Sequence, residues 1–329
     1  MWSRGGLRWK RFVLLAVLLG VGSLSPASAA FPDRSIKFIV PFAAGGPTDA
    51  LARYLAEGVR TRLGQPVIIE NRAGAGANVG AEYVANATPD GYTLLFGTSG
   101  PLAINVSLYP KLGYDPLKSF DPVIMIGKLP NVLSVHPSVP ATNLRELIAY
   151  AKARRGELTF SSSGNGASTH LSGVMFNAVA GTDILHVPYR GGAPAINDLL
   201  GGQVQMSFAD VFVSAPHIKA GTLRALGVTT LERTPVLPDV PTFDEQGLKG
   251  FDVSVFFGIV APKGTPIEII EKLNTAFAAV MDDPSIKSML EAQGIIRAPS
   301  NSPSHLGRFM ADEIPRWREV IKSIGLEIQ

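Results

Sequence analysis

Short apolar runs alternate with amphipathic runs along the whole chain, and this alternation restricts the fold more than any other feature of the sequence. The run Ile36–Val40 has the length of a buried strand, and residues 49–63 carry apolar side chains at helical spacing before Gly64 ends them. The same order recurs as far as the C-terminus. It predicts an α/β protein with mostly parallel sheets flanked by helices.

The remaining elements are predicted from the same two periodicities. Further strands are expected at residues 67–70, 92–96, 158–161, 184–188, 204–208, 224–228 and 253–260. Further helices are expected at residues 78–86, 143–154, 168–179, 193–200, 266–281, 284–293 and 303–324.

The alternation breaks at two places. Apolar stretches at 123–127 and 132–136 follow one another without a helix between them, and the proline-rich segment 235–247 precedes the strand that starts near residue 250. We interpret both breaks as crossings between two lobes. Residues 30–130 and 251–329 then form the first lobe and residues 131–250 the second. Ligands commonly bind between such lobes.

The first thirty residues have the layout of a secretory signal. Four cationic residues precede an apolar run at 12–24, and small residues follow at 26–30, with cleavage expected near Ala29. The run is shorter than a membrane span needs. The sequence therefore predicts a signal peptide of the Sec type over residues 1–29 and a periplasmic protein.

The charge balance changes once this segment is set aside. Four of the 30 Lys and Arg residues, and none of the 27 Asp and Glu residues, lie in the first thirty positions, which leaves 26 cations against 27 acids. A nucleic-acid partner is therefore not expected. The chain has no cysteine, which excludes disulfides and thiolate metal sites. No metal or cofactor is predicted.

Glycine-rich turns follow several of the predicted strands and lead directly into helices. The first is "VPFAAGGPTDALARYLAEGV", where Thr48 or Asp49 is a plausible N-cap. Similar turns occur in "LFGTSGPLAIN", "TFSSSGNGASTHLSGVMF" and "VPYRGGAPAINDLL". Each turn alone is explained by packing and capping. Together they suggest an anion site, because unpaired N–H groups at helix starts favour carboxylates and phosphates.

The sequence supports a catalytic site less well than an anion-binding site. A hydrolase triad can be assembled from Ser163, His170 and Asp210, but neither a G-x-S-x-G elbow nor an H-E-x-x-H motif is present. His170 is also explained as a residue of a helix's first turn. Asp210 is either the N-cap of a helix at 211–220 or an acceptor for a ligand hydroxyl, ammonium or water. The chain is predicted not to be an enzyme, with a secreted serine hydrolase as the alternative.

Five segments carry a resemblance to a known family: "PFAAGGPTDALAR", "VIIENRAGAGANVGAEYVANATPDGYTLL", "SSSGNGASTHL", "VPYRGGAPAINDLLGGQVQMSFAD" and "FFGIVAPKGTP". The chain resembles the Bug-type periplasmic receptors of tripartite tricarboxylate transporters. The resemblance implies a two-lobe periplasmic binding protein of type II, a Venus flytrap. Such a receptor closes on a small organic acid and delivers it to the permease subunits of the transporter. A periplasmic sensor subunit is a further alternative.

The resemblance also implies which residues contact the ligand. In the first lobe they are Phe42, Ala44, Gly45, Asp49, Thr98 and Ser99. In the second lobe they are Ser163, Gly164, Thr169, His170, Tyr189, Gly191 and Asp210. Relatives commonly have tryptophan where this chain has Phe256, a difference that bears on the size of the pocket.

Overall fold

The computed structural model describes residues 31–323 and 325, so the predicted signal peptide at 1–29 lies outside the described residues. The chain divides into two compact units, residues 1–33 and 34–329. The helices and strands of the described residues all belong to the second unit. None of the described helices is both long and apolar enough to cross a membrane.

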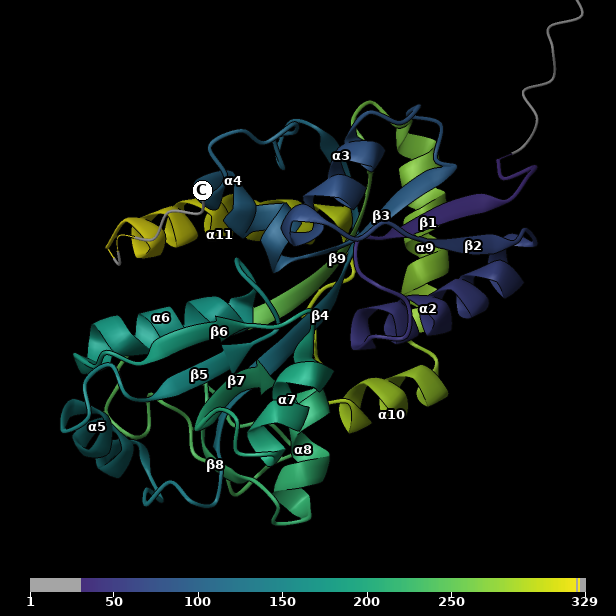
Figure 1. The fold of residues 1–329 in the computed structure, drawn as a ribbon. Helices are drawn as coiled ribbons and strands as arrows, with labels where there is room; N and C mark the ends of the chain where they lie inside the picture. Colours follow the sequence, from purple (N-terminus) through teal and green to yellow (C-terminus); the bar gives the residue numbers. More distant parts are fainter. Residues whose placement is uncertain (1–30, 324, 326–329) are drawn as a thin grey trace, which may run out of the picture. The chain divides into compact units, whose positions relative to one another are not determined.

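One part of the sheet contains three parallel strands, with β1 between β2 and β3 (Figure 1). Next to β3 lies β9, and next to β9 lies β4, each antiparallel to its neighbour. The strands are β1 (Ile36–Val40), β2 (Val67–Asn71), β3 (Thr93–Thr98), β9 (Ser254–Pro262) and β4 (Phe120–Val135). The helices around them are α2 (Pro47–Leu63), α3 (Asn78–Ala85), α9 (Ile267–Met281) and α11 (Pro303–Ser323).

The other part of the sheet is built on the second half of β4, which pairs with β7 and β8 in antiparallel fashion. Beyond β7 come β5 and β6, both parallel to it. These strands are β7 (Met206–Asp210), β8 (Arg224–Val228), β5 (Thr159–Ser162) and β6 (Leu185–Pro188). The helices here are α5 (Leu144–Lys152), α6 (Ser168–Ala180), α7 (Gly192–Leu200) and α8 (Val211–Lys219).

The α/β class is confirmed, and the sheet is mixed because every pairing of β4 and β9 is antiparallel. Several short elements escaped the sequence prediction. They are η1 (Ala75–Ala77), η2 (Gly100–Ile104), α4 (Asn105–Leu108) and β10 (Ile296–Arg297). The helix predicted at 284–293 is α10 (Pro284–Ala292).

The strand β4 joins the two parts of the sheet. The sequence predicted two separate stretches near residue 130, whereas the structure has one continuous strand of 16 residues. Its neighbour changes within that strand, since Pro130 lies opposite Ser254 of β9 and Asn131 lies opposite Asp210 of β7. Thr229, which follows β8, contacts β4 at this point: its N–H donates to the Asn131 carbonyl at 3.0 Å. Whether the two parts move as separate lobes stays a prediction.

The start of α2 corrects one sequence prediction. The N-cap is Gly46, not Thr48 or Asp49, and Pro47 occupies the first helical position. Proline is favoured there because its fixed φ suits the helix and its missing N–H would have no partner. Asp49 therefore falls within the first turn, where its carboxylate serves a different purpose.

Candidate functional site

The carboxyl ends of the strands from both parts of the sheet meet at the crossing of β4. Strands β3 and β4 run in the same direction because both are antiparallel to β9, so β4 leaves the first part at Pro130, at the carboxyl edge of β1, β2 and β3. Strand β7 ends at Asp210, opposite Asn131, and β5 and β6 run parallel to it. The loops that follow all six strands thus face this crossing, where α/β proteins place their ligands.

Asp49 organises the loop after β1. Its carboxylate accepts hydrogen bonds from Gly45 N–H at 2.9 Å, from Arg53 at 2.9 and 3.1 Å, and from Asn71 Nδ2 at 2.9 Å. The same Asn71 amide donates to the Phe42 carbonyl at 3.0 Å. Burial by itself raises the pKa of Asp49, but the hydrogen bonds from Arg53, Gly45 and Asn71 lower it overall. Both carboxylate oxygens are thus occupied by groups from this loop, from α2 and from the end of β2.

The loop that Asp49 holds is open and supplies backbone donors. Ala44 and Gly45 are exposed, and Gly45 has a φ of 84°, a conformation that favours glycine. The first helical bond of α2 is Ala50 N–H to Gly46 C=O. The N–H groups of Thr48 and Asp49 therefore find no carbonyl acceptor among the described residues.

The loop after β3 is mostly buried. Thr98 and Ser99 are buried at the end of the strand. Asn105 Nδ2 donates to the Gly76 carbonyl at 2.8 Å and to Asn78 Oδ1 at 2.6 Å, which fixes this loop to the loop after β2. The structure therefore places Thr98 and Ser99 beneath the surface at the carboxyl edge of the strand.

The loop after β5 is closed on itself by Ser163 and Thr169. The Thr169 hydroxyl accepts from Ser163 N–H at 3.0 Å and lies 2.7 Å from the Ser163 hydroxyl. Gly164, with a φ of 132°, allows the tight turn between them. These bonds shape the loop before any ligand arrives.

The first turn of α6 presents three consecutive N–H groups. The helix bonding begins with Leu171 N–H to the Ala167 carbonyl at 3.0 Å. Ser168, Thr169 and His170 come before it, and their N–H groups have no acceptor among the described residues. Because the helix dipole adds positive potential here, this turn is the most complete anion-binding feature of the edge.

Three stacked aromatic rings lie at this turn. His170 stacks on His186 with centroids 4.0 Å apart, and His186 stacks on Phe160 at 4.9 Å. His186 Nε2 lies 2.7 Å from the Ser162 hydroxyl, and His170 Nδ1 accepts from Gly166 N–H at 3.2 Å. Burial lowers the pKa of His170 to about 4; burial and the charge of His170 lower the pKa of His186 to about 3. Both imidazoles are neutral at pH 7.

The hydrolase triad considered from the sequence is not assembled. Ser163 bonds to Thr169 rather than to a histidine. His170 accepts a backbone N–H, and Asp210 accepts Val213 N–H at 3.1 Å as the N-cap of α8. Each of the three side chains thus has a different partner.

Tyr189 joins the loop after β6 to its neighbours. Its hydroxyl donates to Asp198 Oδ2 at 2.6 Å, and its N–H donates to the Ser162 carbonyl at 3.1 Å. Burial, this hydrogen bond and the charge of Asp198 raise the pKa of Tyr189 to about 12. Gly191 follows as the N-cap of α7, with a φ of 126°. Tyr189 thus positions the backbone at this edge.

Phe256, expected at the ligand pocket, is buried in the core. Its side chain is 1% exposed and meets the Phe309 ring edge to face at 4.9 Å. Lys128, its neighbour across the sheet, places Nζ 4.9 Å from the centroid of the same Phe309 ring. The structure therefore gives Phe256 a packing role against α11.

Several residues that shape the site were not singled out from the sequence. Arg53 is four residues after Asp49 on the same helix, a spacing that could have suggested the pair. Asn71, Asn131 and His186 gave no such signal, because their partners lie far away in the sequence.

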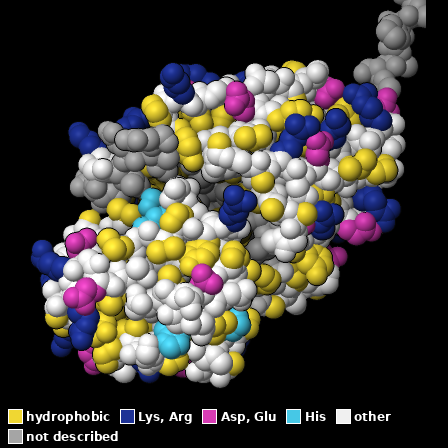
Figure 2. Space-filling model, viewed as in Figure 1, with side chains coloured by type: hydrophobic (Ala, Val, Ile, Leu, Met, Phe, Trp, Pro, Cys, Tyr) yellow, Lys and Arg dark blue, Asp and Glu magenta, His cyan; other side chains and the backbone are white. Residues whose placement is uncertain are grey.

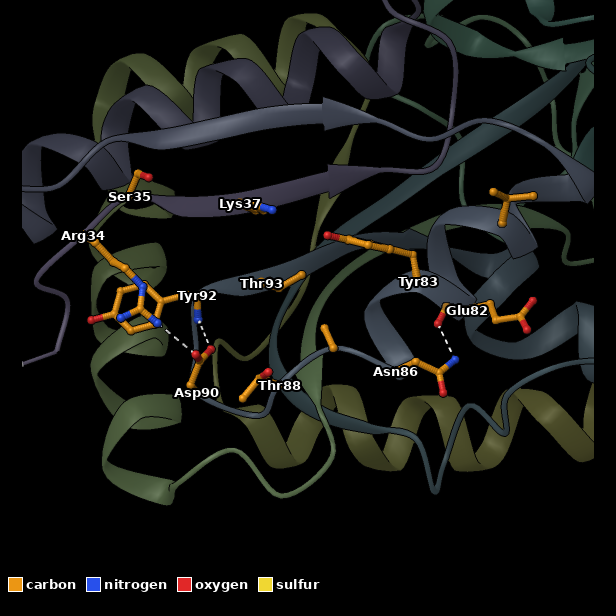
Figure 3. Close-up of a pocket in the computed structure, with 12 residues that line it drawn as sticks. Arg34, Ser35, Lys37, Glu82, Tyr83, Asn86, Thr88, Asp90, Tyr92 and Thr93 are labelled. Atoms are coloured by element: carbon orange, nitrogen blue, oxygen red, sulfur yellow. Dashed lines mark hydrogen bonds and ion pairs between the residues drawn. The ribbon is translucent and has the colours of Figure 1, made fainter.

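A cavity of about 730 Å³ lies elsewhere, at the amino ends of β1 and β3 (Figure 3). There the guanidinium of Arg34 lies 3.7 Å from the centre of the Tyr92 ring and donates to Asp90 at 3.0 Å. Lys37 and Tyr83 also line it. This cavity is at the opposite end of the strands from the glycine-rich loops. The face shown in Figure 2 carries cationic and acidic side chains interspersed, not gathered by sign.

Comparisons with known proteins agree on one family. The family model described as "Tripartite tricarboxylate transporter family receptor" (TctC) matches residues 51–326. Protein BugT of Bordetella pertussis is 39% identical over 310 residues, covering 94% of this chain and 95% of BugT. A UPF0065 protein from the tcbD-tcbE intergenic region of Pseudomonas sp. strain P51 is 37% identical over 316 residues, covering 95% of this chain and 94% of that protein.

Solved structures point the same way. Rhodopseudomonas palustris MatC with bound malate is 36% identical with a TM-score of 0.82, covering 88% of this chain and 100% of that one. R. palustris Rpa4515 with adipate is 40% identical with a TM-score of 0.85, covering 91% and 100%. The periplasmic binding protein BugD is 39% identical with a TM-score of 0.84, covering the same shares. The chain therefore belongs to the tripartite tricarboxylate transporter receptor family and has the fold of its Bug-type periplasmic binding proteins.

Proposed function

We propose that the protein is an exported, periplasmic receptor that binds a small organic carboxylate at the crossing of β4 and delivers it to a membrane permease. The observation that carries this proposal is the row of unpaired N–H groups at Ser168, Thr169 and His170. Two relatives of known structure hold adipate and malate, both organic acids.

Binding would rest on backbone donors and not on a cationic side chain. A carboxylate at the first turn of α6 accepts hydrogen bonds from N–H groups that are already oriented, so little ordering is needed on binding. The N–H groups of Thr48 and Asp49 on the first loop would take the other end of the ligand. Closure of the two predicted lobes would then exclude water and signal occupancy to the permease.

A thermal-shift screen tests the proposal directly. Mature protein, residues 30–329, would be unfolded, stripped of ligand and refolded, then screened against adipate, malate, succinate, citrate, glutamate and benzoate with the matching amides as controls. A ligand at about a thousand times its Kd adds about 4 kcal/mol of stability. This raises Tm by roughly 2 °C or more per kcal/mol. A shift with an acid and none with its amide is expected; equal shifts would contradict a carboxylate site.

Thr169→Val tests the role of the α6 loop. The variant removes the hydroxyl that accepts from Ser163 N–H, so the loop loses its closure and adipate or malate affinity should fall about tenfold. Thr182→Val is the matched control, because the Thr182 hydroxyl bonds to Asn177 Oδ1 beyond the other end of the same helix. Isothermal titration calorimetry measures both. Equal losses in the two variants would place the ligand elsewhere.

A further inference from the structure

The carboxylate of Asp210 lies near the backbone N–H groups of Val213, Asp210 and Phe212, but its two oxygens are not equally engaged. Oδ1 accepts from Val213 N–H at 3.1 Å, whereas no hydrogen bond to Oδ2 forms among the described residues. Oδ2 lies 3.6 Å from the position that a Cβ on Gly192 would occupy, so it is beside the first residue of α7. The side chain is half-buried. An anionic oxygen is therefore available at the start of a helix.

This oxygen lies on the same face and edge of the sheet as the α6 turn. Phe208 packs against Phe176 of α6, and Asp210, two residues further along the strand, points to the same face. Asn131 lies opposite Asp210, and its side-chain amide donates to the Ser168 hydroxyl at 3.2 Å. Asp210 and the N–H groups of α6 are thus both neighbours of Asn131.

Asp210 forms no ion pair within the described residues. Asn131 lies opposite it, Val213 donates to it and Gly192 lies beside it, and none of these three is titratable. The titratable groups on the surrounding elements are Asp121 and Lys128 on β4, His170 on α6, Tyr189 and Arg190 before α7, Asp198 within α7, and His217 and Lys219 in the last turn of α8.

None of those groups contributes to the shift of the Asp210 pKa. Burial raises that pKa to about 6, and the backbone N–H groups of Val213, Asp210 and Phe212 offset part of the rise. The carboxyl thus has only backbone groups to stabilise its charge.

We infer that the receptor takes up one proton with each carboxylate ligand and that Asp210 carries this proton on Oδ2. The inference rests on the proposed function. Two carboxylates that share one site cannot both stay ionised without a large cost, so one of them takes a proton. Protonated Asp210 becomes a donor and binds a ligand oxygen. The proton comes from solvent, and no other bond is made or broken.

Calorimetry of the mature protein measures this proton. Adipate and malate would each be titrated between about pH 6.5 and 8.5, where aliphatic carboxylic acids are ionised. Each titration is repeated in two buffers of different ionisation enthalpy. The difference in binding heat between the two buffers gives the number of protons taken up per ligand. We expect uptake to approach one proton per ligand, and Kd to rise about tenfold per pH unit.

Asp210→Asn isolates the group responsible. Asparagine is also a good N-cap, so α8 keeps its start while the titrating oxygen is lost. Proton uptake should vanish, and Kd should become independent of pH. Asp183→Asn is the matched control: it removes an exposed acid before the amino end of β6 and should leave the wild-type profile unchanged.

The possible failures are distinguishable. Binding of adipate or malate with no proton uptake by the wild type would overturn the inference while the proposed function stood. Dependence of Kd on Na⁺ in place of pH would do the same, since a metal cation would then separate the two carboxylates. Uptake that persists in Asp210→Asn would assign the proton to another residue. Absence of binding by every acid at every pH would overturn the proposed function as well.

Discussion

The carboxylate of Asp49 accepts four hydrogen bonds, and its replacement should loosen the first loop. Asp49→Asn keeps the size of the side chain but removes the charge that Arg53 and Gly45 N–H need. We expect the free energy of unfolding to fall by about 2–3 kcal/mol in urea titrations at pH 7. The loss should shrink near pH 3, because the pKa of Asp49 is lowered by folding and its stabilisation is lost as that carboxyl becomes protonated.

Glu57→Gln is the control for this substitution. Glu57 pairs with Arg60 on the exposed side of the same helix, and solvent screens such a pair so that it contributes little to stability. Similar losses in the two variants would show that the buried position of Asp49 does not matter.

The stacked histidines should make stability depend on pH. Folding lowers the pKa of His170 to about 4 and of His186 to about 3, so the unfolded chain binds more protons than the folded one below its own histidine pKa of about 6.5. Stability is full above pH 6.5 and falls as pH drops towards 4. Each histidine contributes up to about 1.4 kcal/mol per pH unit.

His186→Gln tests this dependence. The variant should lose stability between pH 6.5 and 4 with a visibly shallower slope than the wild type, as measured by urea unfolding at several pH values. Parallel slopes would mean that His186 is not buried as a neutral base.

At the scale of elements, α6 offers a test of close packing. A Cβ on Gly173 would overlap the ring of Phe160, which stacks on His186. Gly173→Ala should therefore destabilise the protein by about 1–3 kcal/mol, although alanine favours helix formation by itself. Gly307→Ala in α11 is the control. A Cβ there would lie 3.3 Å from Pro122 Cγ, which is a tight contact but not an overlap. Both are measured by thermal or urea unfolding. A stabilised Gly173→Ala variant would contradict the overlap.

The order of the elements was predictable from the sequence because the periods of strands and helices differ. The helical segment at residues 100–108 was not predicted, because Gly100 and Pro101 are typical of turns. The continuity of β4 was missed because Lys128, Pro130 and Asn131 interrupt the apolar pattern between the two predicted stretches. The pairing of β3 with β9 joins residues too distant for any local pattern to show.

The candidate site was predictable only in outline. The glycines and small polar residues marked which loops lie at the carboxyl edge. The part played by each side chain depends on partners far along the chain, as when Asn131 bonds to Ser168 and Ser172. For the same reason the sequence could not show that Asn71 bonds to Asp49 or that Phe256 is buried.

At the scale of the whole molecule, the two predicted lobes can be tested by distance measurements. The chain has no cysteine, so spin labels attach only at engineered positions. Thr61→Cys on α2 with Lys152→Cys on α5 spans the predicted lobes, and both positions are exposed. Adipate or malate, whichever binds, should shorten this distance by several ångströms in pulsed EPR.

Thr61→Cys with Glu268→Cys on α9 is the control pair, because both positions lie in the predicted first lobe. Its distance should not change with the ligand. An unchanged distance in both pairs, with binding confirmed by calorimetry, would contradict closure of two lobes.

The position of β9 has a consequence for how the chain is made. A ribosome completes β3 and β4 long before residues 254–262, yet β9 lies between them in the sheet. Until β9 has emerged, β3 and β4 lack the strand that joins them, and unpaired strand edges invite wrong partners. Such long-range pairing also slows folding. The nascent chain thus cannot complete its first sheet until residues 254–262 have been made.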